Sequence, residues 1–188
     1  MPPLQVRTLA AAIVAIGLSA CTPGADLQEL PPYAQGSYRL GGGDQVRIIT
    51  FGVEPLSGQF RVDDQGNIAM PLVGGVHAAG RTPDELAGYI QSRLRGQKFV
   101  KEPSVSVEVL AYRPIFVLGE VARPGQYSFS PGMTMLTAVA VAGGFTYRAV
   151  ESYASDIRTI EGHAVEGKIV PSSFLAPGDV VKIYERHF

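Results

Sequence analysis

Cysteine is almost absent from this chain, because Cys21 is the only one among 188 residues. A single thiol cannot form an intramolecular disulfide, and a structural zinc site needs several thiolate or imidazole ligands at set spacings. The three histidines (His77, His163 and His187) lie far apart and match no such spacing. The sequence therefore predicts neither a disulfide scaffold nor a zinc site.

A surplus of charge is also missing. The chain has 16 Lys and Arg residues and 17 Asp and Glu residues, a formal net charge of −1. A nucleic-acid partner would require a basic face, so none is expected. Motifs of catalysis are missing as well: no Ser-His-Asp arrangement, phosphate loop or paired acid and base can be named. The sequence favours a protein that is not an enzyme and has no cofactor.

Long apolar runs are missing too. The longest, residues 9–20, is short of the roughly 20 apolar residues of a membrane-spanning helix. Arg7 precedes it and Leu18-Ser19-Ala20 ends it, a pattern typical of a secretory signal peptide at residues 1–20. Leu18-Ser19-Ala20-Cys21 resembles a bacterial lipobox, which predicts cleavage between Ala20 and Cys21 and a diacylglycerol on the Cys21 sulfur. The alternative is an ordinary signal peptide followed by a chance cysteine.

Residues 21–36 have proline, glycine and polar residues without periodicity, so we expect an extended lipidated tether. Its fifteen residues after Cys21 could span up to about 50 Å. Folded structure is predicted to begin near Ser37.

The next segments predict a first small unit. A strand is expected over 41–52, with Val46 and Ile48 on one face, and two strands around an Asp64-Gln65-Gly66 hairpin turn within 60–76. Residues 82–96 predict a helix that Thr82 and Glu85 begin as a capping box. Residues 103–110 alternate as a half-buried strand.

A second unit is expected after Tyr112. Residues 114–121 are more continuously apolar and predict a buried strand. Residues 133–144 predict a short helix that is apolar nearly all round and hence buried. A hairpin near 155–165 and a last strand from Pro177 complete an α+β fold of two small units.

One pattern occurs twice. Residues 43–48 and 178–183 share the form Gly-Asp-x-Val-Arg/Lys-Ile. Glycine permits the turn, the aspartate can accept hydrogen bonds from nearby backbone N–H groups, and alternate apolar residues enter a core. One carboxylate per loop is too few for a calcium site, so both are interpreted as turns.

These segments together resemble a known family. Residues 37–110, with "YRLGGGDQVRI", "FRVDDQGNIAMPLVGGVHAAGRTPDELAGYI" and "EPSVSVEV", resemble the polysaccharide export domain of outer-membrane Wza-like lipoproteins. Residues 114–184, with "FVLGEVARPGQYSFSPGMTMLTAVAVAGGFTYRA" and "LAPGDVVKIY", resemble a β-grasp domain of the SLBB type. The resemblance implies an export domain at 37–112 and an SLBB domain at 113–188.

The resemblance also implies a function. Members form rings of identical subunits (octamers in the relatives) that conduct capsular polysaccharide or exopolysaccharide and dock on an inner-membrane polysaccharide co-polymerase. We therefore expect a lipid-anchored protein of the outer membrane that faces the periplasm. Thr22 follows the cysteine in place of the aspartate that commonly retains lipoproteins at the inner membrane.

One feature departs from the longest relatives, which continue into a C-terminal membrane-crossing helix. The last predicted strand ends near Tyr184, and the four residues after it cannot span a bilayer. The chain thus resembles the short class, which would need a separate outer-membrane barrel or act as a periplasmic adaptor. Two rivals stay open: a monomeric glycan- or ligand-binding periplasmic lipoprotein, separable from a ring by its size in detergent, and a cell-wall-modifying enzyme.

Overall fold

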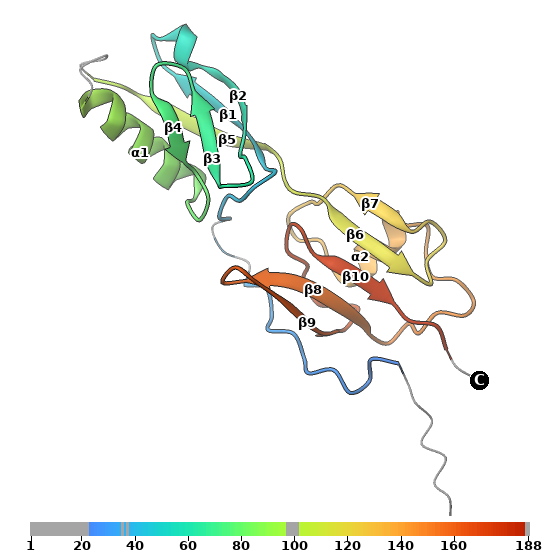
Figure 1. The fold of residues 1–188 in the computed structure, drawn as a ribbon. Helices are drawn as coiled ribbons and strands as arrows, with labels where there is room; N and C mark the ends of the chain where they lie inside the picture. The colour runs from blue at the N-terminus through green and yellow to red at the C-terminus, as the bar shows by residue number, and fades with distance from the viewer. Residues whose placement is uncertain (1–22, 35, 37, 97–101, 187–188) are drawn as a thin grey trace, which may run out of the picture.

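The computed structural model describes residues 23–34, 36, 38–96 and 102–186. The chain forms two packed units that follow one another, and it passes from the first to the second at residues 112–114 (Figure 1). Each unit has its own cluster of buried apolar side chains, which includes Ile48 and Leu86 in the first and Ile115 and Met135 in the second. The α+β fold class is confirmed.

The first unit is built on a three-stranded antiparallel sheet in the order β2-β1-β5. Its central strand β1 (Gln45–Thr50) alternates strictly between exposed and buried residues, as the sequence predicts, and Val46, Ile48 and Thr50 face the core. The flanking strands are β2 (Gly58–Arg61) and β5 (Val105–Ala111), and the short helix η1 (Glu54–Leu56) joins β1 to β2.

Helix α1 (Pro83–Gly96) covers this core. The predicted capping box is confirmed: the Glu85 backbone N–H donates to Thr82 Oγ1 at 3.2 Å, and the Thr82 backbone N–H donates to Glu85 Oε2 at 3.1 Å. Leu86, Ile90 and Leu94 follow at helical spacing and are fully buried. The local sequence therefore fixes both the start of the helix and the face that packs.

The predicted hairpin around residues 64–66 is wrong. A turn does form there, but β2 before it pairs with β1, whereas β3 (Asn67–Met70) after it pairs with β4 (Gly74–His77). The hairpin of this region is β3–β4, and its connection holds Leu72 at a φ of 62°. The segments on both sides of this turn alternate between apolar and polar residues, so the sequence predicts two strands. Only the packing of the core decides which strand each of them pairs with.

The second unit has a five-stranded mixed sheet in the order β7-β6-β10-β8-β9. Strand β10 (Val180–Ile183) lies in its centre, parallel to β6 (Ile115–Gly119) and antiparallel to β8 (Ala154–Ile160). The predicted hairpin of β8 with β9 (His163–Ile169) is confirmed, and Glu161-Gly162 connects the two strands with positive φ at both residues. The edge strand β7 (Gly125–Tyr127) pairs with β6, and α2 (Met135–Val141) packs on one sheet face.

Two expected burials in this unit are corrected. Strand β6 is buried on one face only, because Phe116 and Leu118 point away from α2 and are 38% and 43% exposed. Helix α2 is likewise covered on one side, and its outer residues Leu136 and Val141 are 51% and 45% exposed. A continuous apolar run indicates burial on both faces in a closed domain, but this unit presents apolar residues on two outer surfaces.

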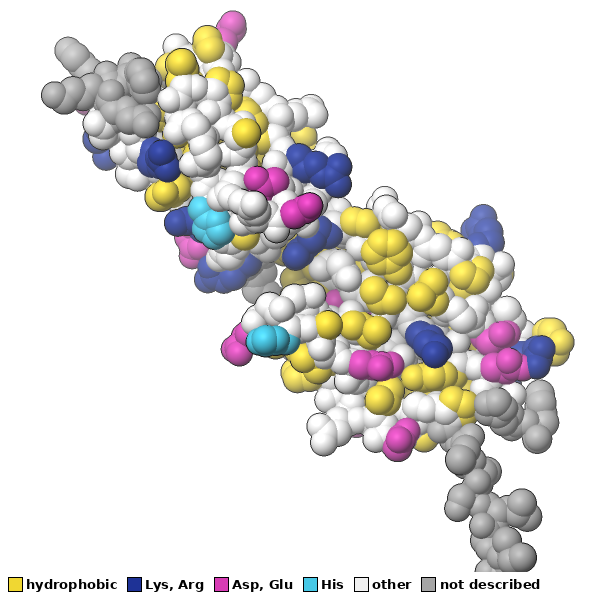
Figure 2. All heavy atoms as spheres, viewed as in Figure 1, with side chains coloured by type: hydrophobic (Ala, Val, Ile, Leu, Met, Phe, Trp, Pro, Cys, Tyr) yellow, Lys and Arg dark blue, Asp and Glu magenta, His cyan; other side chains and the backbone are white. Residues whose placement is uncertain are grey.

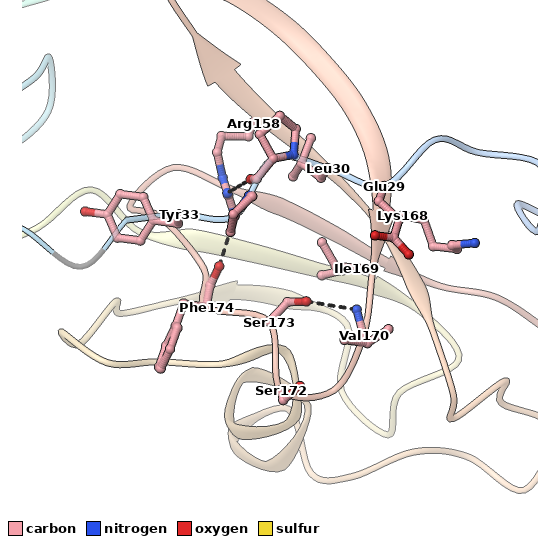
Figure 3. A pocket seen from close by; sticks show the side chains of 12 residues that line it. Glu29, Leu30, Tyr33, Arg158, Lys168, Ile169, Val170, Ser172, Ser173 and Phe174 are labelled. Atoms are coloured by element: carbon pink, nitrogen blue, oxygen red, sulfur yellow. Dashed lines mark hydrogen bonds between the residues drawn. The ribbon is translucent and has the colours of Figure 1, made fainter.

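The expected tether is also corrected. Residues 28–33 are extended, but they lie along β9 instead of standing free: Lys168 N–H donates to Gln28 O at 2.8 Å, and Leu30 N–H donates to Lys168 O at 3.0 Å. Leu30 joins the second core, and it lies so close to Gly167 that a Cβ there would be 2.8 Å from the Leu30 Cβ. Figure 3 shows Leu30 and Tyr33 beside Arg158 and Ile169.

Gly119 at the end of β6 yields a stability prediction. Its φ is 84°, and a Cβ there would lie 2.0 Å from the backbone carbonyl oxygen of Ile183 in β10. We expect Gly119→Ala to lower the free energy of unfolding by about 3 kcal/mol or more, from strained φ and overpacking together. Thermal or urea unfolding of the purified protein measures it.

Gly132 offers the matched control, since its φ of 82° is similar and a Cβ there would meet open space. Gly132→Ala should cost only about 1–2 kcal/mol, the conformational term alone. Equal losses for the two variants would contradict the close approach of β6 and β10.

Candidate functional site

The first Gly-Asp turn buries its carboxylate. Asp44 has no exposed surface, and its Oδ2 accepts hydrogen bonds from Gly41 N–H at 2.8 Å and from the Tyr38 hydroxyl at 2.5 Å. Its Oδ1 accepts one from the Arg113 backbone N–H at 2.9 Å. Arg113 belongs to the connection between the units, so one buried carboxylate of the first unit fixes the start of the second.

The second Gly-Asp turn repeats this local geometry. Asp179 is 1% exposed, and its Oδ2 accepts a hydrogen bond from the Ala176 N–H at 2.7 Å, the residue three positions earlier, as in the first turn. Arg158 of β8 donates to Asp179 from Nε at 3.1 Å and from Nη2 at 2.7 Å. Both motifs are therefore confirmed as turns in which the aspartate accepts a hydrogen bond from a nearby backbone N–H group.

Arg158 also bonds to segments outside the Gly-Asp turn. Its Nη1 donates to Pro31 O at 3.2 Å and its Nη2 to Phe174 O at 3.1 Å, which ties residues 28–33 to the second unit (Figure 3). Its guanidinium carbon also lies 5.6 Å from the centre of the Tyr33 ring. Burial raises the pKa of the Tyr33 hydroxyl, although the positive charges of Arg113 and Arg158 oppose the shift.

A second carboxylate shares this guanidinium. Asp156 has no exposed surface, its Oδ2 lies 3.0 Å from Arg158 Nη2, and its Oδ1 has no hydrogen-bond partner. Burial, and then the neighbouring Asp179 carboxylate, raise the pKa of Asp156 to about 8 against the opposing charge of Arg158. The closed, doubly acidic surroundings therefore favour the protonated form of Asp156 near neutral pH.

A groove lies where the two units meet residues 31–34, 36 and 38; we call it the joint groove. It consists of two adjoining cavities of 720 Å³ and 280 Å³, which share Tyr33, Gly36 and Tyr38. The larger cavity is lined by arginines and the smaller by aromatic rings: Arg39, Arg113 and Arg158 in one, and Tyr112 and Phe129 in the other. Such a volume falls within the roughly 300–1,000 Å³ of small-molecule sites. A third cavity of 350 Å³ lies between residues 29–33 and β9.

The acidic side chains of this region are buried. The carboxylates Asp156 and Asp179 are covered by protein and both pair with Arg158, so neither is exposed to a ligand in the groove. Among the described residues there is no group of three or more His, Cys, Asp and Glu side chains that could hold a metal ion. Within those same residues, no helix has both the length and the apolar character needed to cross a bilayer.

The residues that sequence reasoning nominated are not among those that the structure describes. Ala20 and Cys21, the predicted cleavage and lipidation residues, lie outside the described residues. The nearest described residue, Pro23, accepts a hydrogen bond from the Tyr153 hydroxyl at 3.0 Å. Sequence reasoning missed Arg113 and Arg158, since each is far in sequence from the aspartate it meets, and only the repeated Gly-Asp motif indicated that a buried carboxylate would need a partner.

Comparison with known proteins gives matches on both units. Residues 32–110 match the family model described as "Polysaccharide biosynthesis/export protein", and residues 114–166 match the model of the SLBB domain. The two matched ranges meet at the connection that holds Arg113.

Individual relatives agree with this. The chain is 34% identical over 118 residues to the exopolysaccharide production protein ExoF of Rhizobium meliloti (57% of this chain and 28% of that protein). It is 31% identical over 157 residues to the EPS I polysaccharide export outer membrane protein EpsA of Ralstonia nicotianae (77% and 40%). It is 29% identical over 109 residues to the polysialic acid transport protein KpsD of Escherichia coli (57% and 19%). The chain thus spans less than half the length of these curated relatives.

Asp156 predicts a pH dependence of stability. With a pKa of about 8 in the folded state and an ordinary value of 3.8, the folded protein binds more protons than the unfolded chain between these values. Stability should therefore fall as the pH rises from about 4 to about 8. Asp156→Asn mimics the protonated carboxyl and should flatten this fall, so that the variant is more stable than the parent at pH 8 by at least about 1 kcal/mol.

Urea unfolding at a series of pH values measures this. Asp64→Asn, at an exposed carboxylate in the 64–66 turn, is the matched control and should follow the parent profile. A parent profile that rises between pH 5 and 8, or an Asp156→Asn profile parallel to the parent, would show that Asp156 is ionised in the fold.

Proposed function

The chain belongs to the polysaccharide biosynthesis/export protein family, with an export domain followed by an SLBB domain, and from this premise we propose that it serves the export of exopolysaccharide or capsular polysaccharide. The observation that carries the proposal is the succession of the two family domains in one chain, each with its own core. Relatives named for exopolysaccharide production, polysaccharide export and polysialic acid transport support it.

We place the protein at the outer membrane, held by a lipid on Cys21. The relative EpsA is named an outer membrane export protein, which supports this location. The packing of the N-terminal segment supports a short anchor: Pro23 is bonded to Tyr153, and a Cβ on Gly24 would clash with the Tyr184 ring. Only Cys21 and Thr22 would then separate the lipid from the second unit, a span of about 7 Å at most.

This anchor would hold the SLBB domain near the bilayer. Its nearest end carries the exposed Tyr147 together with Arg148 and Arg186, which pair with Glu185 and Glu151. Tyrosine and basic side chains are suited to the membrane–water interface. The earlier expectation of a folded part about 50 Å away is therefore replaced by a close one.

We further propose that copies of the chain assemble into a closed ring. A ring needs two different surfaces that meet between neighbours, and the SLBB domain has apolar side chains on two opposite sides. Figure 2 shows hydrophobic side chains gathered over the sheet face, where Phe116, Val180 and Ile157 form a row across β6, β10 and β8. The outer side of α2 adds Leu136 and Val141. By family resemblance, eight copies and partners in both membranes (a co-polymerase and an outer-membrane barrel) are proposed.

Deletion of the gene in its own host tests the function. We expect the polysaccharide to disappear from the cell surface and medium while the cells still contain precursor, and a plasmid copy to restore export. Immunodetection or sugar analysis of surface and cell fractions measures it. A deletion strain that still exports at the parental level would rule out the proposed role.

Replacement of the anchor tests the location. Cys21→Ser, carried behind an ordinary secretory signal peptide, should leave the fold intact and move the protein from the membrane to the soluble periplasmic fraction. The reason is that two or more acyl chains hold a protein firmly where one chain is marginal. Thr22→Ser, which keeps the cysteine, is the control and should stay with the membrane. Retention of Cys21→Ser on membranes in cells without the partner proteins would refute the anchor.

A further inference from the structure

The joint groove combines aromatic rings with an arginine whose donors are mostly unused. Tyr38 and Tyr112 pack edge to face at 4.8 Å between ring centres, and Tyr112 and Phe129 do so at 5.6 Å. These rings form a rigid aromatic end of the groove. The arginine-lined end adjoins it, and no acidic side chain is among the described residues that line either cavity.

Arg113 differs from the other two arginines of this groove. Arg158 is 7% exposed, and all three of its nitrogens donate to protein oxygens. Arg39 lies at the rim and donates to Gly80 O and Glu85. The Arg113 guanidinium, with its side chain 33% exposed, makes one hydrogen bond, from Nη2 to the Tyr38 hydroxyl at 3.3 Å. Its buried Nε forms an ion pair with Asp44 Oδ1 at 3.6 Å but no hydrogen bond, so the exposed part of the guanidinium is what a ligand can reach.

The environment holds this guanidinium in place. The Arg113 backbone N–H is fixed by Asp44 at 2.9 Å, and Nη1 lies against Gly41, where an added Cβ would be 2.4 Å from it. Tyr38 is itself fixed by its bond to Asp44, and burial and that bond raise the pKa of its hydroxyl, so it stays protonated. A positioned, half-buried guanidinium with free donors favours a planar carboxylate over a neutral group.

We propose that the joint groove binds an acidic sugar residue of a polysaccharide, with the sugar carboxylate on Arg113 and the ring against the aromatic end. This inference rests on the proposed export function, which supplies a glycan as the ligand, and it adds the chemical class of that glycan: one that contains uronic acid or another carboxylated sugar. The contacts come from Tyr33, Gly36 and Tyr38, from the connection and from the SLBB domain, so a bound residue would bridge all three.

Calorimetric titration of the full-length protein in detergent tests the site. The probes are tetragalacturonate and its fully methyl-esterified form, which keeps the sugar rings but removes the charge. We expect the acid to bind at least about tenfold more tightly than the ester, the difference typical of a charge-assisted hydrogen bond. Inorganic phosphate at the same concentration should compete poorly, because it cannot use the aromatic end.

Variants identify the residue. Arg113→Ala should reduce binding of the acid to the level of the ester, and Arg113→Lys should weaken it, because a lysine lacks the planar fork. Gly41→Ala keeps every charge but displaces the guanidinium, and should resemble Arg113→Ala. Arg148→Lys, at the far end of the SLBB domain, is the matched control and should bind as the parent does. Thermal unfolding of each variant verifies its fold.

Several results would overturn the inference: equal binding of acid and ester, parental binding by Arg113→Ala, or displacement by phosphate as effective as by free tetragalacturonate. The deletion experiment separates these failures from failure of the proposed function. If deletion abolishes export while the acid probe does not bind, only the sugar class is wrong; if deletion leaves export intact, the function itself is wrong.

Discussion

The structure depends on the burial of carboxylates at two turns. A buried ionised carboxylate is costly unless it is paired and hydrogen-bonded, and the Gly-Asp turns of both units put Asp44 and Asp179 where water cannot reach them. Backbone N–H groups satisfy each carboxylate in part. The Tyr38 hydroxyl and the Arg113 backbone N–H complete the partners of Asp44, and the Arg158 guanidinium completes those of Asp179. Because Arg113 and Arg158 come from other segments, a local requirement of two turns becomes a constraint on how distant segments are placed.

The placement of the N-terminal segment follows from that constraint. Arg158 must lie over Asp179, and in that position its Nη1 meets the Pro31 carbonyl, so residues 28–33 have a fixed route along β9. Leu30 then fills the second core beside Gly167, where no larger residue would fit. A segment rich in proline, which by composition alone is a spacer, thus becomes part of the SLBB domain. Under the proposed lipid anchor on Cys21, this route decides whether the domain stands away from the bilayer or against it.

The sequence predicted what local chemistry decides. The capping box of α1, the alternation of β1 and the β8–β9 hairpin are confirmed, because each depends on residues within a few positions of one another. The predictions from sequence failed where a distant segment decides the outcome. Strand β2 pairs with β1 instead of β3, and Phe116 is exposed although it lies in an apolar run. The groove could not be predicted either, since Tyr38, Arg113 and Phe129 meet only through the tertiary fold.

The two turns also differ, and the difference indicates which of them retains a binding capacity. At Asp179 the guanidinium is consumed by Asp156, Asp179 and two carbonyls, so this copy of the motif is closed and structural. At Asp44 the carboxylate is satisfied chiefly by backbone N–H groups and by Tyr38, which leaves the Arg113 side chain positioned but with little to bond. The Arg113 side chain is 33% exposed, so a ligand that supplies acceptors can form charge-assisted hydrogen bonds with the accessible part of its guanidinium. The two Gly-Asp turns therefore differ in role. The turn of Asp179, whose arginine has all its nitrogens bonded, stabilises the protein, whereas the turn of Asp44, beside Arg113, is suited to bind a ligand.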